Sequence, residues 1–546
     1  MFRRITLCTF AIFALVTTGQ ARQTPSLADL KTTPESTDYK STSTYDDVVR
    51  FMKAVDEASP LVYYTTYGKT YDGRDMPLTV VGAGLKDASP ASVRATNRLR
   101  VHIQGNIHAG EVEGKEAAQV LLREFAMGQH ADWLRSMVFL ITPIFNADGN
   151  EKFALTNRQR QNGPINGMGT RANAQNLNIN RDYMKLDTPE AKAFVKLMND
   201  YDPHVSYDLH TSDGSYHGYY LTYSPPLNPD TDPAIMKIMT DEWFPYVTKD
   251  MKAKHGWDSF YYGNASTPGG RGGGRGGAPR AACSTPVVPE GVTRAWATFE
   301  HVPRFHNNYV GLRNRFALLS EAYAYATFED RIKATNDFLA ASLDFARQNA
   351  AKLKKAIADA DRATIGGQPL ATTSKFKTGG TVDILMGEVE PETNPVNQAV
   401  MCRRKDVTKV EKMTDMMWFE PATTEVVPQA YYVPLDATKA IELLKAHGIQ
   451  MREVPAPIDV EPFFITSNVA AQNFEGHTMR KLEGKWGGNI DLVASAKVLE
   501  VRTNQPLGRL AFYLLEPTSD DGLVAWNYLD DQLKDGKTVY PIIRKK

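Results

Sequence analysis

The sequence predicts an α/β fold with a mostly parallel sheet, followed by a second domain that is rich in strands. From about residue 45 to residue 348, strand-like and helix-like patterns alternate, which is typical of a parallel sheet whose strands are joined by helices. Beyond residue 380, short runs of β-branched and aromatic residues are separated by turn residues, which favours an antiparallel sandwich or a mixed module. We therefore expect a first domain over 45–356, a linker rich in glycine, threonine and serine over 363–380, and a strand-rich domain over 381–546.

Individual elements of the first domain follow from the spacing of apolar residues. Strands are expected where apolar and polar residues alternate or where an apolar run is continuous, over 98–105, 136–145, 204–210 and 315–325. Helices are expected where apolar residues recur at helical spacing, over 114–125, 188–201 and about 330–356. The last of these helices closes the domain.

The N-terminal segment has the pattern of a secretory signal peptide over 1–21. A basic start with Arg3 and Arg4 precedes an apolar stretch from Ile5 to Thr17, and small residues follow up to Ala21. The apolar stretch is short for a membrane span. We therefore expect cleavage after Ala21, export to the periplasm or the extracellular space, and no membrane span in the mature chain.

Composition argues against several classes of partner. Of the 546 residues, 42% are hydrophobic and 23% are charged, and 63 basic residues balance 63 acidic ones. No net field therefore favours nucleic acid or an anionic membrane. The glycine- and arginine-rich segment over 267–280 is expected to be a flexible surface loop and not a nucleic-acid site.

The mature chain is expected to keep two cysteines. Cys8 lies in the signal segment, so Cys283 and Cys402 remain. Two cysteines cannot form a disulfide framework of the kind that holds small secreted domains. The sequence leaves open whether these two cysteines pair with each other. Because about 120 positions separate them, it favours unpaired small hydrophobic residues over a disulfide.

A candidate metal site begins where the first expected strand ends. His108 and Glu111 lie three positions apart at the entry of a helix, and His210 lies at the carboxyl end of another expected strand. Because sites in open α/β sheets gather outside the carboxyl ends of strands, these side chains can meet there. Two imidazoles, one carboxylate and an open position are the ligand set of a hydrolytic zinc site. The sequence has no HExxH segment, which excludes the helix-borne arrangement of that motif.

A further carboxylate is expected at the same edge of the sheet. Glu321 ends an apolar strand, where an unpaired charge is costly to bury. A metal-activated water needs a nearby base, and Glu321 is the best-placed candidate. Glu300 is the second candidate, although its surroundings resemble a loop in which a solvated acid is the default.

Arginine and amide side chains cluster between these landmarks. One segment supplies Arg158 and Arg160, and a second supplies Asn178, Asn180 and Arg181. Arginine can hold a substrate carboxylate with two parallel hydrogen bonds or stabilise an oxyanion beside a metal.

Together these motifs resemble, in order, the signature of the zinc carboxypeptidase family of carboxypeptidase A type. The resemblance covers about 45–356 and rests on HAGE (108–111), PIFNADGNE (143–151), NRQR (157–160), NINRD (178–182), His210 and a strand glutamate. It implies a mixed, mostly parallel sheet flanked by helices and one Zn²⁺ per chain, held by His108, Glu111 and His210. It also implies that Glu321 is the general base and later the proton donor.

The resemblance also implies roles in binding a peptide that has a free C-terminal carboxylate. Arg160 would polarise the scissile carbonyl, and Asn180 with Arg181 would clamp the terminal carboxylate. The arginine motif is one residue tighter than is usual in the family, so Arg158 could take the role of Arg160. The tyrosine that closes over substrate has no clear counterpart, and Tyr309 is the candidate, with Tyr261 and Tyr262 as alternatives.

The strand-rich end of the chain, with NFEGH (473–477), resembles C-terminal extensions of larger bacterial members. The leading hypothesis is therefore an exported zinc metallocarboxypeptidase. One alternative is a zinc amidohydrolase or cell-wall peptide hydrolase on the same scaffold, because metal and base are common to both. The other is a non-catalytic binding protein that uses a degenerate peptidase scaffold.

Overall fold

A computed structural model describes residues 26–212, 214–266, 283, 291–488, 497–534 and 536–545. The expected signal peptide and the glycine- and arginine-rich segment lie outside these residues. Within the described residues, no helix is long and apolar enough to cross a membrane.

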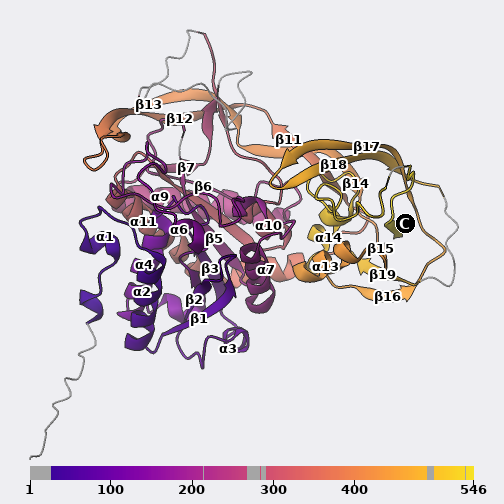
Figure 1. Cartoon of the computed structure of the whole chain (residues 1–546), viewed down its shortest axis with the longest axis horizontal. Helices are drawn as coiled ribbons and strands as arrows, with labels where there is room; N and C mark the ends of the chain where they lie inside the picture. Colours follow the sequence, from indigo (N-terminus) through magenta and orange to yellow (C-terminus); the bar gives the residue numbers. More distant parts are fainter. Residues whose placement is uncertain are drawn as a thin grey trace, which may run out of the picture.

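The first domain is built on an eight-stranded mixed sheet (Figure 1). Its strands are β1 (Val62–Lys69), β2 (Asp75–Val81), β3 (Leu99–Gly105), β4 (Met137–Thr142), β5 (Val205–Ser212), β6 (Leu221–Ser224), β7 (Ser259–Tyr261) and β10 (Phe316–Tyr323). They lie in the order β1-β2-β4-β3-β5-β10-β6-β7. The four central strands β4, β3, β5 and β10 are parallel. The pairs β1–β2, β2–β4 and β10–β6 are antiparallel, and β7 pairs parallel with β6. The α/β fold with a mixed, mostly parallel sheet is therefore confirmed.

Helices cover both faces of this sheet. One apolar core joins it to α2 (Tyr45–Ala58), α4 (Glu113–Ala126), α9 (Phe244–His255), α11 (Phe328–Gln348) and α12 (Ala350–Arg362). On the other face lie α7 (Pro189–Tyr201) and α10 (His306–Leu312), whose apolar residues share a core with the C-terminal part of the chain. The expected helix over 330–356 is thus two helices that meet at Asn349.

The remaining short helical elements of this region are α1 (Thr33–Ser36), α3 (Pro90–Ala95), α5 (Trp133–Ser136), α6 (Ala147–Asn150) and α8 (Pro233–Ile238), with η1 (Leu27–Asp29), η2 (Ile179–Arg181) and η3 (Met239–Trp243). The start of α7 illustrates how the sequence sets these boundaries. Thr188 accepts a hydrogen bond from the N–H of Ala191, and Pro189 occupies the first turn, which satisfies one free N–H and places proline where its missing donor costs nothing.

The segment that was expected to be a linker contains a strand. Within 363–380, β11 (Pro369–Lys377) pairs antiparallel with β14 (Trp418–Val426). The linker prediction rested on the content of small polar residues, but threonine is β-branched and suits a pleated strand. Leu370 and Ala371 are buried in this strand, which supplies the apolar contacts that the composition alone did not reveal.

The next two strands connect the two parts of the chain. A long ribbon of β12 (Thr381–Thr393) and β13 (Val400–Met416) pairs with β9 (Ala295–Ala297), which pairs in turn with β8 (Asn264–Ser266). Figure 1 shows this ribbon lying along the first domain. Strands β12 and β13 therefore share a sheet with β8 and β9, which precede β10 in the chain.

The C-terminal part is rich in strands, as expected. An antiparallel sheet has the order β16-β19-β15-β20, and a separate hairpin lies beside it (Figure 1). The elements are β15 (Ala430–Pro434), α13 (Thr438–His447), β16 (Arg452–Pro455), β17 (Phe463–Phe474), β18 (His477–Trp486), β19 (Lys497–Arg502), α14 (Gly508–Leu515) and β20 (Ile543–Lys545), with β17 and β18 forming the hairpin.

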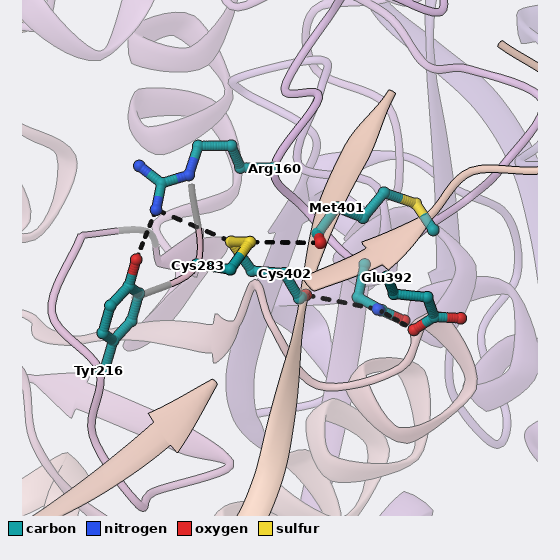
Figure 2. Close-up of a disulfide and its surroundings, with 7 residues drawn as sticks. Arg160, Tyr216, Cys283, Glu392, Met401 and Cys402 are labelled. Atoms are coloured by element: carbon teal, nitrogen blue, oxygen red, sulfur yellow. Dashed lines mark hydrogen bonds between the residues drawn. A yellow bond between two sulfur atoms is a disulfide. The ribbon is translucent and has the colours of Figure 1, made fainter. Parts of the chain in front are cut away.

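The two cysteines form a disulfide, which corrects the expectation that they are unpaired. The Cys283–Cys402 bond has an S–S distance of 2.07 Å and lies beside Arg160 and Tyr216 (Figure 2). Cys402 belongs to β13, and its N–H donates to the carbonyl of Arg160 over 2.9 Å. Separation along the chain was a poor guide because β13 folds back across the first domain and brings Cys402 to Cys283.

Candidate metal centre and active site

The three expected metal ligands converge at the carboxyl ends of β3 and β5. His108 and Glu111 follow β3, and His210 lies in β5. Nδ1 of His108 is 3.1 Å from one carboxylate oxygen of Glu111, and Nδ1 of His210 is 2.8 Å from the other. One ligand atom from each residue lies within 4.8 Å of the others. Each residue is only 3% exposed. The three side chains therefore form a buried and compact set of potential metal ligands.

The opposite nitrogen of each imidazole is held by a neighbour. Nε2 of His108 lies 3.0 Å from Oδ1 of Asn178, and Nε2 of His210 lies 2.8 Å from Oδ2 of Asp208. Both partners are acceptors, so each Nε2 carries a hydrogen and each Nδ1 faces the cluster. Metal-binding histidines are oriented in this way by their surroundings. The donor set and its supports therefore fit a zinc ion.

Electrostatics also favour a cation at this point. Burial alone would raise the pKa of Glu111, but the neighbouring His108 and Arg158 hold that pKa well below its ordinary value. Burial lowers the pKa of His108 to about 3. Burial also acts to lower the pKa of His210, but the carboxylates of Asp208 and Glu111 together outweigh it and raise that pKa well above its ordinary value. His210 itself lies between the buried carboxylates of Asp208 and Glu111, and two carboxylates this close together favour a bound cation.

Arg158, rather than Arg160, lies at the cluster. NH1 of Arg158 is 3.1 Å from Oε1 of Glu111, and its NH2 donates to the carbonyl of Thr211. Arg160 instead donates to the hydroxyl of Tyr216 and lies 3.7 Å from Sγ of Cys402 (Figure 2). Of the two candidate arginines, Arg158 is therefore the one that contacts the cluster, and the side chain of Arg160 faces Tyr216 and the disulfide.

Glu321 lies on the strand beside His210. Strand β10 pairs parallel with β5, and in this pairing Glu321 is in register with His210. On the other side of β10, Glu321 is paired with Thr222 of β6. Partners in register on neighbouring strands project to the same face of a sheet. Glu321 is partly exposed, in keeping with a position at the edge of the site. The second candidate, Glu300, has an exposed side chain in a loop.

Asn180 and Arg181 occupy η2 next to the metal ligands. Nδ2 of Asn180 is 3.4 Å from Nε2 of His210, and its Oδ1 accepts the N–H of His306. The guanidinium of Arg181 lies 3.8 Å from the centre of the Phe305 ring. Burial lowers the pKa of Arg181 to about 9, so this side chain is still positively charged at neutral pH.

Tyr309, the candidate for the tyrosine that closes over substrate, lies in the core. It is 0% exposed. Its hydroxyl lies 2.8 Å from Nδ1 of His447 and accepts a hydrogen bond from Arg313. His447 ends α13 of the C-terminal part, so the burial of Tyr309 depends on an element more than a hundred residues away in the sequence.

Three residues of the site had no role in the sequence analysis. Asp208 precedes His210 by two positions, and strand alternation places both on one face, which is a signal that could have been used. Asn178 was noted as an amide without a function. Arg171 lies 3.4 Å from Oε1 of Glu111, and nothing in the sequence indicates this contact because a long loop brings it there.

Sequence comparisons relate this chain to known carboxypeptidases. Residues 48–267 match the model of the zinc carboxypeptidase family. Carboxypeptidase 2 of Trichophyton equinum is 23% identical, and the alignment covers 97% of this chain and 91% of that protein. Carboxypeptidase 2 of Trichophyton rubrum is also 23% identical, over 91% of this chain and 85% of that protein.

Solved structures with likeness to this chain include two carboxypeptidases. The metallo-carboxypeptidase of Burkholderia cenocepacia is 17% identical, with a TM-score of 0.40 over 57% of this chain and 70% of that one. The carboxypeptidase A of Helicoverpa armigera is 11% identical, with a TM-score of 0.40 over 57% of this chain and 75% of that one.

A mixed α/β sheet that gathers two histidines and a glutamate at its strand ends defines a metallohydrolase. The part of the chain that carries these three residues, 48–267, is a zinc carboxypeptidase domain by its match to that family. The protein is accordingly a zinc-dependent metallocarboxypeptidase, a peptide hydrolase.

Metal content tests the ligand set. We expect the purified wild-type protein to hold one zinc ion per chain. Replacement of His108, Glu111 or His210 by alanine, one at a time, should lower zinc content by at least about tenfold, because each removes one of three protein ligands. Elemental analysis after dialysis measures this. His204, a buried histidine outside the cluster, provides the control: full zinc content in a His108→Ala variant, or equal loss in His204→Ala, would contradict the assignment.

Proposed function

We propose that this protein is an exported exopeptidase that hydrolyses the C-terminal peptide bond of peptides. The observation that carries the proposal is the convergence of His108, Glu111 and His210 within 4.8 Å, with Asn180 beside them. A metal ion held by these three residues would lie next to groups that can hold a terminal carboxylate. Exopeptidase action needs both features at a separation of about one residue of substrate.

Zinc would be held by Nδ1 of His108, the carboxylate of Glu111 and Nδ1 of His210. When bound there, the ion would polarise the scissile carbonyl and lower the pKa of a water. The chain's own side chains carry out the remaining work. Burial of the three ligands keeps bulk water away from their hydrogen bonds, which strengthens the electrostatic interactions of the site.

Glu321 is proposed to move the proton. Its position in register with His210 supports this role, because both side chains project to one face of the sheet. The carboxylate would take a proton from the attacking water and then deliver it to the nitrogen of the departing residue. One carboxylate thereby acts first as a base and then as an acid.

Arg158 is proposed to stabilise the negative charge that develops on the carbonyl oxygen. Its guanidinium lies beside Glu111, where it is already fixed by Gln161 and the carbonyl of Thr211. A donor held in place before the reaction does not have to reorganise in the transition state. Arg160, which is directed toward Tyr216, does not contact the cluster in the described structure.

Asn180 and Arg181 are proposed to bind the terminal carboxylate. They are consecutive residues of η2, and NH1 of Arg181 donates to the carbonyl of Asn180 over 2.6 Å. Stacking on Phe305 holds the guanidinium plane, as suits a group that binds a carboxylate with two parallel hydrogen bonds. The substrate is therefore a peptide with a free C-terminal carboxylate.

Export is proposed on two grounds. The expected signal peptide is the first. The second is the Cys283–Cys402 disulfide, since disulfides persist in oxidising compartments and are rare in the cytosol. Both grounds favour the periplasm or the extracellular space.

The role of Glu321 can be separated from metal binding by substitution. Glu321→Gln should lower kcat by about 10³-fold or more while zinc content stays near one per chain, since the amide cannot accept the proton. Turnover of a blocked dipeptide and elemental analysis of the same sample measure both. Glu300→Gln is the matched control and should remain active. Activity in Glu321→Gln with loss in Glu300→Gln would transfer the role to Glu300.

The exopeptidase assignment can be tested on the substrate. Two peptides that differ only in a free or an amidated C-terminus should differ in kcat/KM by about 10²-fold or more, because amidation removes the charge that Arg181 would bind. Mass spectrometry of the products measures the difference. Equal cleavage of both peptides would exclude exopeptidase action and favour an amidohydrolase on the same scaffold.

A further inference from the structure

The hairpin of β17 and β18 has an unusual residue at its turn. Phe474 and His477 are paired, which leaves Glu475 and Gly476 as the two turn residues. Both have positive φ, 45° for Glu475 and 84° for Gly476. Two-residue turns of this kind favour asparagine or glycine at the first position, and a glutamate there is conformationally unfavourable. The turn conformation therefore does not explain why a glutamate occupies position 475.

The hairpin turn lies against the first domain. Nε2 of His477 is 2.8 Å from Oδ2 of Asp187, and the guanidinium of Arg304 lies over the ring of Phe474 at 5.1 Å. A Cβ at Gly476 would be 3.9 Å from Leu177. These contacts hold the hairpin turn against residues 177–187, which include η2, and against Arg304.

A chain of hydrogen bonds leads from this turn to the metal ligands. Oε2 of Glu475 accepts the backbone N–H of Asn178 over 2.9 Å. The side-chain oxygen of Asn178 accepts from Nε2 of His108 over 3.0 Å and from the N–H of Asn180 over 3.1 Å. Glu475 of the C-terminal part thus holds the backbone of Asn178. Asn178 in turn orients both the metal ligand His108 and the start of η2.

We propose that Glu475 is a positioning residue of the active site, supplied by the C-terminal hairpin. It fixes Asn178, and through Asn178 it fixes the ring of His108 and the position of Asn180. The role rests on the proposed function of those residues. A carboxylate acceptor suits this role because a hydrogen bond to a charged group is shorter and stronger than a neutral one.

The charge of Glu475 also suits the surroundings. Burial lowers the pKa of Arg181, and the carboxylates of Glu300 and Glu475 oppose that fall. Glu475 therefore helps to keep the carboxylate-binding guanidinium charged. Under this proposal, the C-terminal part contributes one residue, Glu475, to the active site.

The experiment uses the full-length zinc enzyme with Glu475→Asn and Glu475→Gln. Asparagine favours the turn but is one methylene too short to reach Asn178, whereas glutamine keeps an acceptor without the charge. We expect Glu475→Asn to have a Tm equal to or above that of wild type, together with about tenfold lower zinc affinity and kcat. Glu475→Gln should be intermediate. Glu483→Gln, an exposed glutamate of β18 that pairs with Lys481, is the control and should match wild type.

The cobalt-substituted enzyme gives a readout that does not depend on turnover. The visible absorption of bound Co²⁺ reports the geometry of its ligands, so Glu475→Asn should change this spectrum and Glu483→Gln should not. An unchanged spectrum with unchanged affinity, or a loss of activity that is matched by a fall in Tm, would overturn the proposal.

A double-mutant cycle tests the route through Asn178. In an Asn178→Ala background, Glu475→Asn should have little further effect on zinc affinity. Alanine lacks the Oδ1 atom through which Asn178 contacts His108, so the position of Glu475 no longer affects that ligand. Additive effects would overturn the route. Wild type and His108→Ala are measured alongside: if wild type bound no metal, the proposed function itself would fail, whereas normal wild type with an inert Glu475→Asn would refute only this inference.

Discussion

The structure depends on how the buried carboxylate of Glu111 is compensated. A carboxylate that is 3% exposed is costly to bury unless cations or donors surround it. Here both oxygens are engaged by His108, His210 and Arg158. These partners come from the ends of different strands and from a loop, so the parallel centre of the sheet is what brings them together. Binding of a divalent ion would satisfy the same charge with better-matched ligands.

The two parts of the chain meet around this site rather than away from it. Tyr309 of α10 contacts His447 of α13, and the segment before η2 receives the turn at Glu475. Apolar residues of α7 and α10 also share a core with α14. The helix layer on this face of the sheet is therefore stabilised by the C-terminal part, which explains how a strand-rich region without metal ligands of its own contributes to the chemistry.

Features of the sequence that follow from local pattern were predictable. The central strands and the positions of His108, Glu111 and His210 at their ends follow from apolar runs and from the geometry of parallel sheets. The choice between Arg158 and Arg160 was not predictable, because a loop conformation decides which side chain turns inward. Tyr309, the Cys283–Cys402 disulfide and Glu475 depend on contacts between distant segments; the bond from Asn178 to Glu475 spans 297 positions, and no periodicity encodes such a contact.

The most direct test of the central claim is X-ray absorption spectroscopy of the zinc-loaded protein. The account predicts only nitrogen and oxygen ligands at about 2.0–2.1 Å, with outer-shell scattering from two imidazole rings. The His210→Ala variant, reconstituted with zinc, should show scattering from a single ring. Sulfur ligation at about 2.3 Å, or imidazole scattering that is unchanged in this variant, would contradict the account.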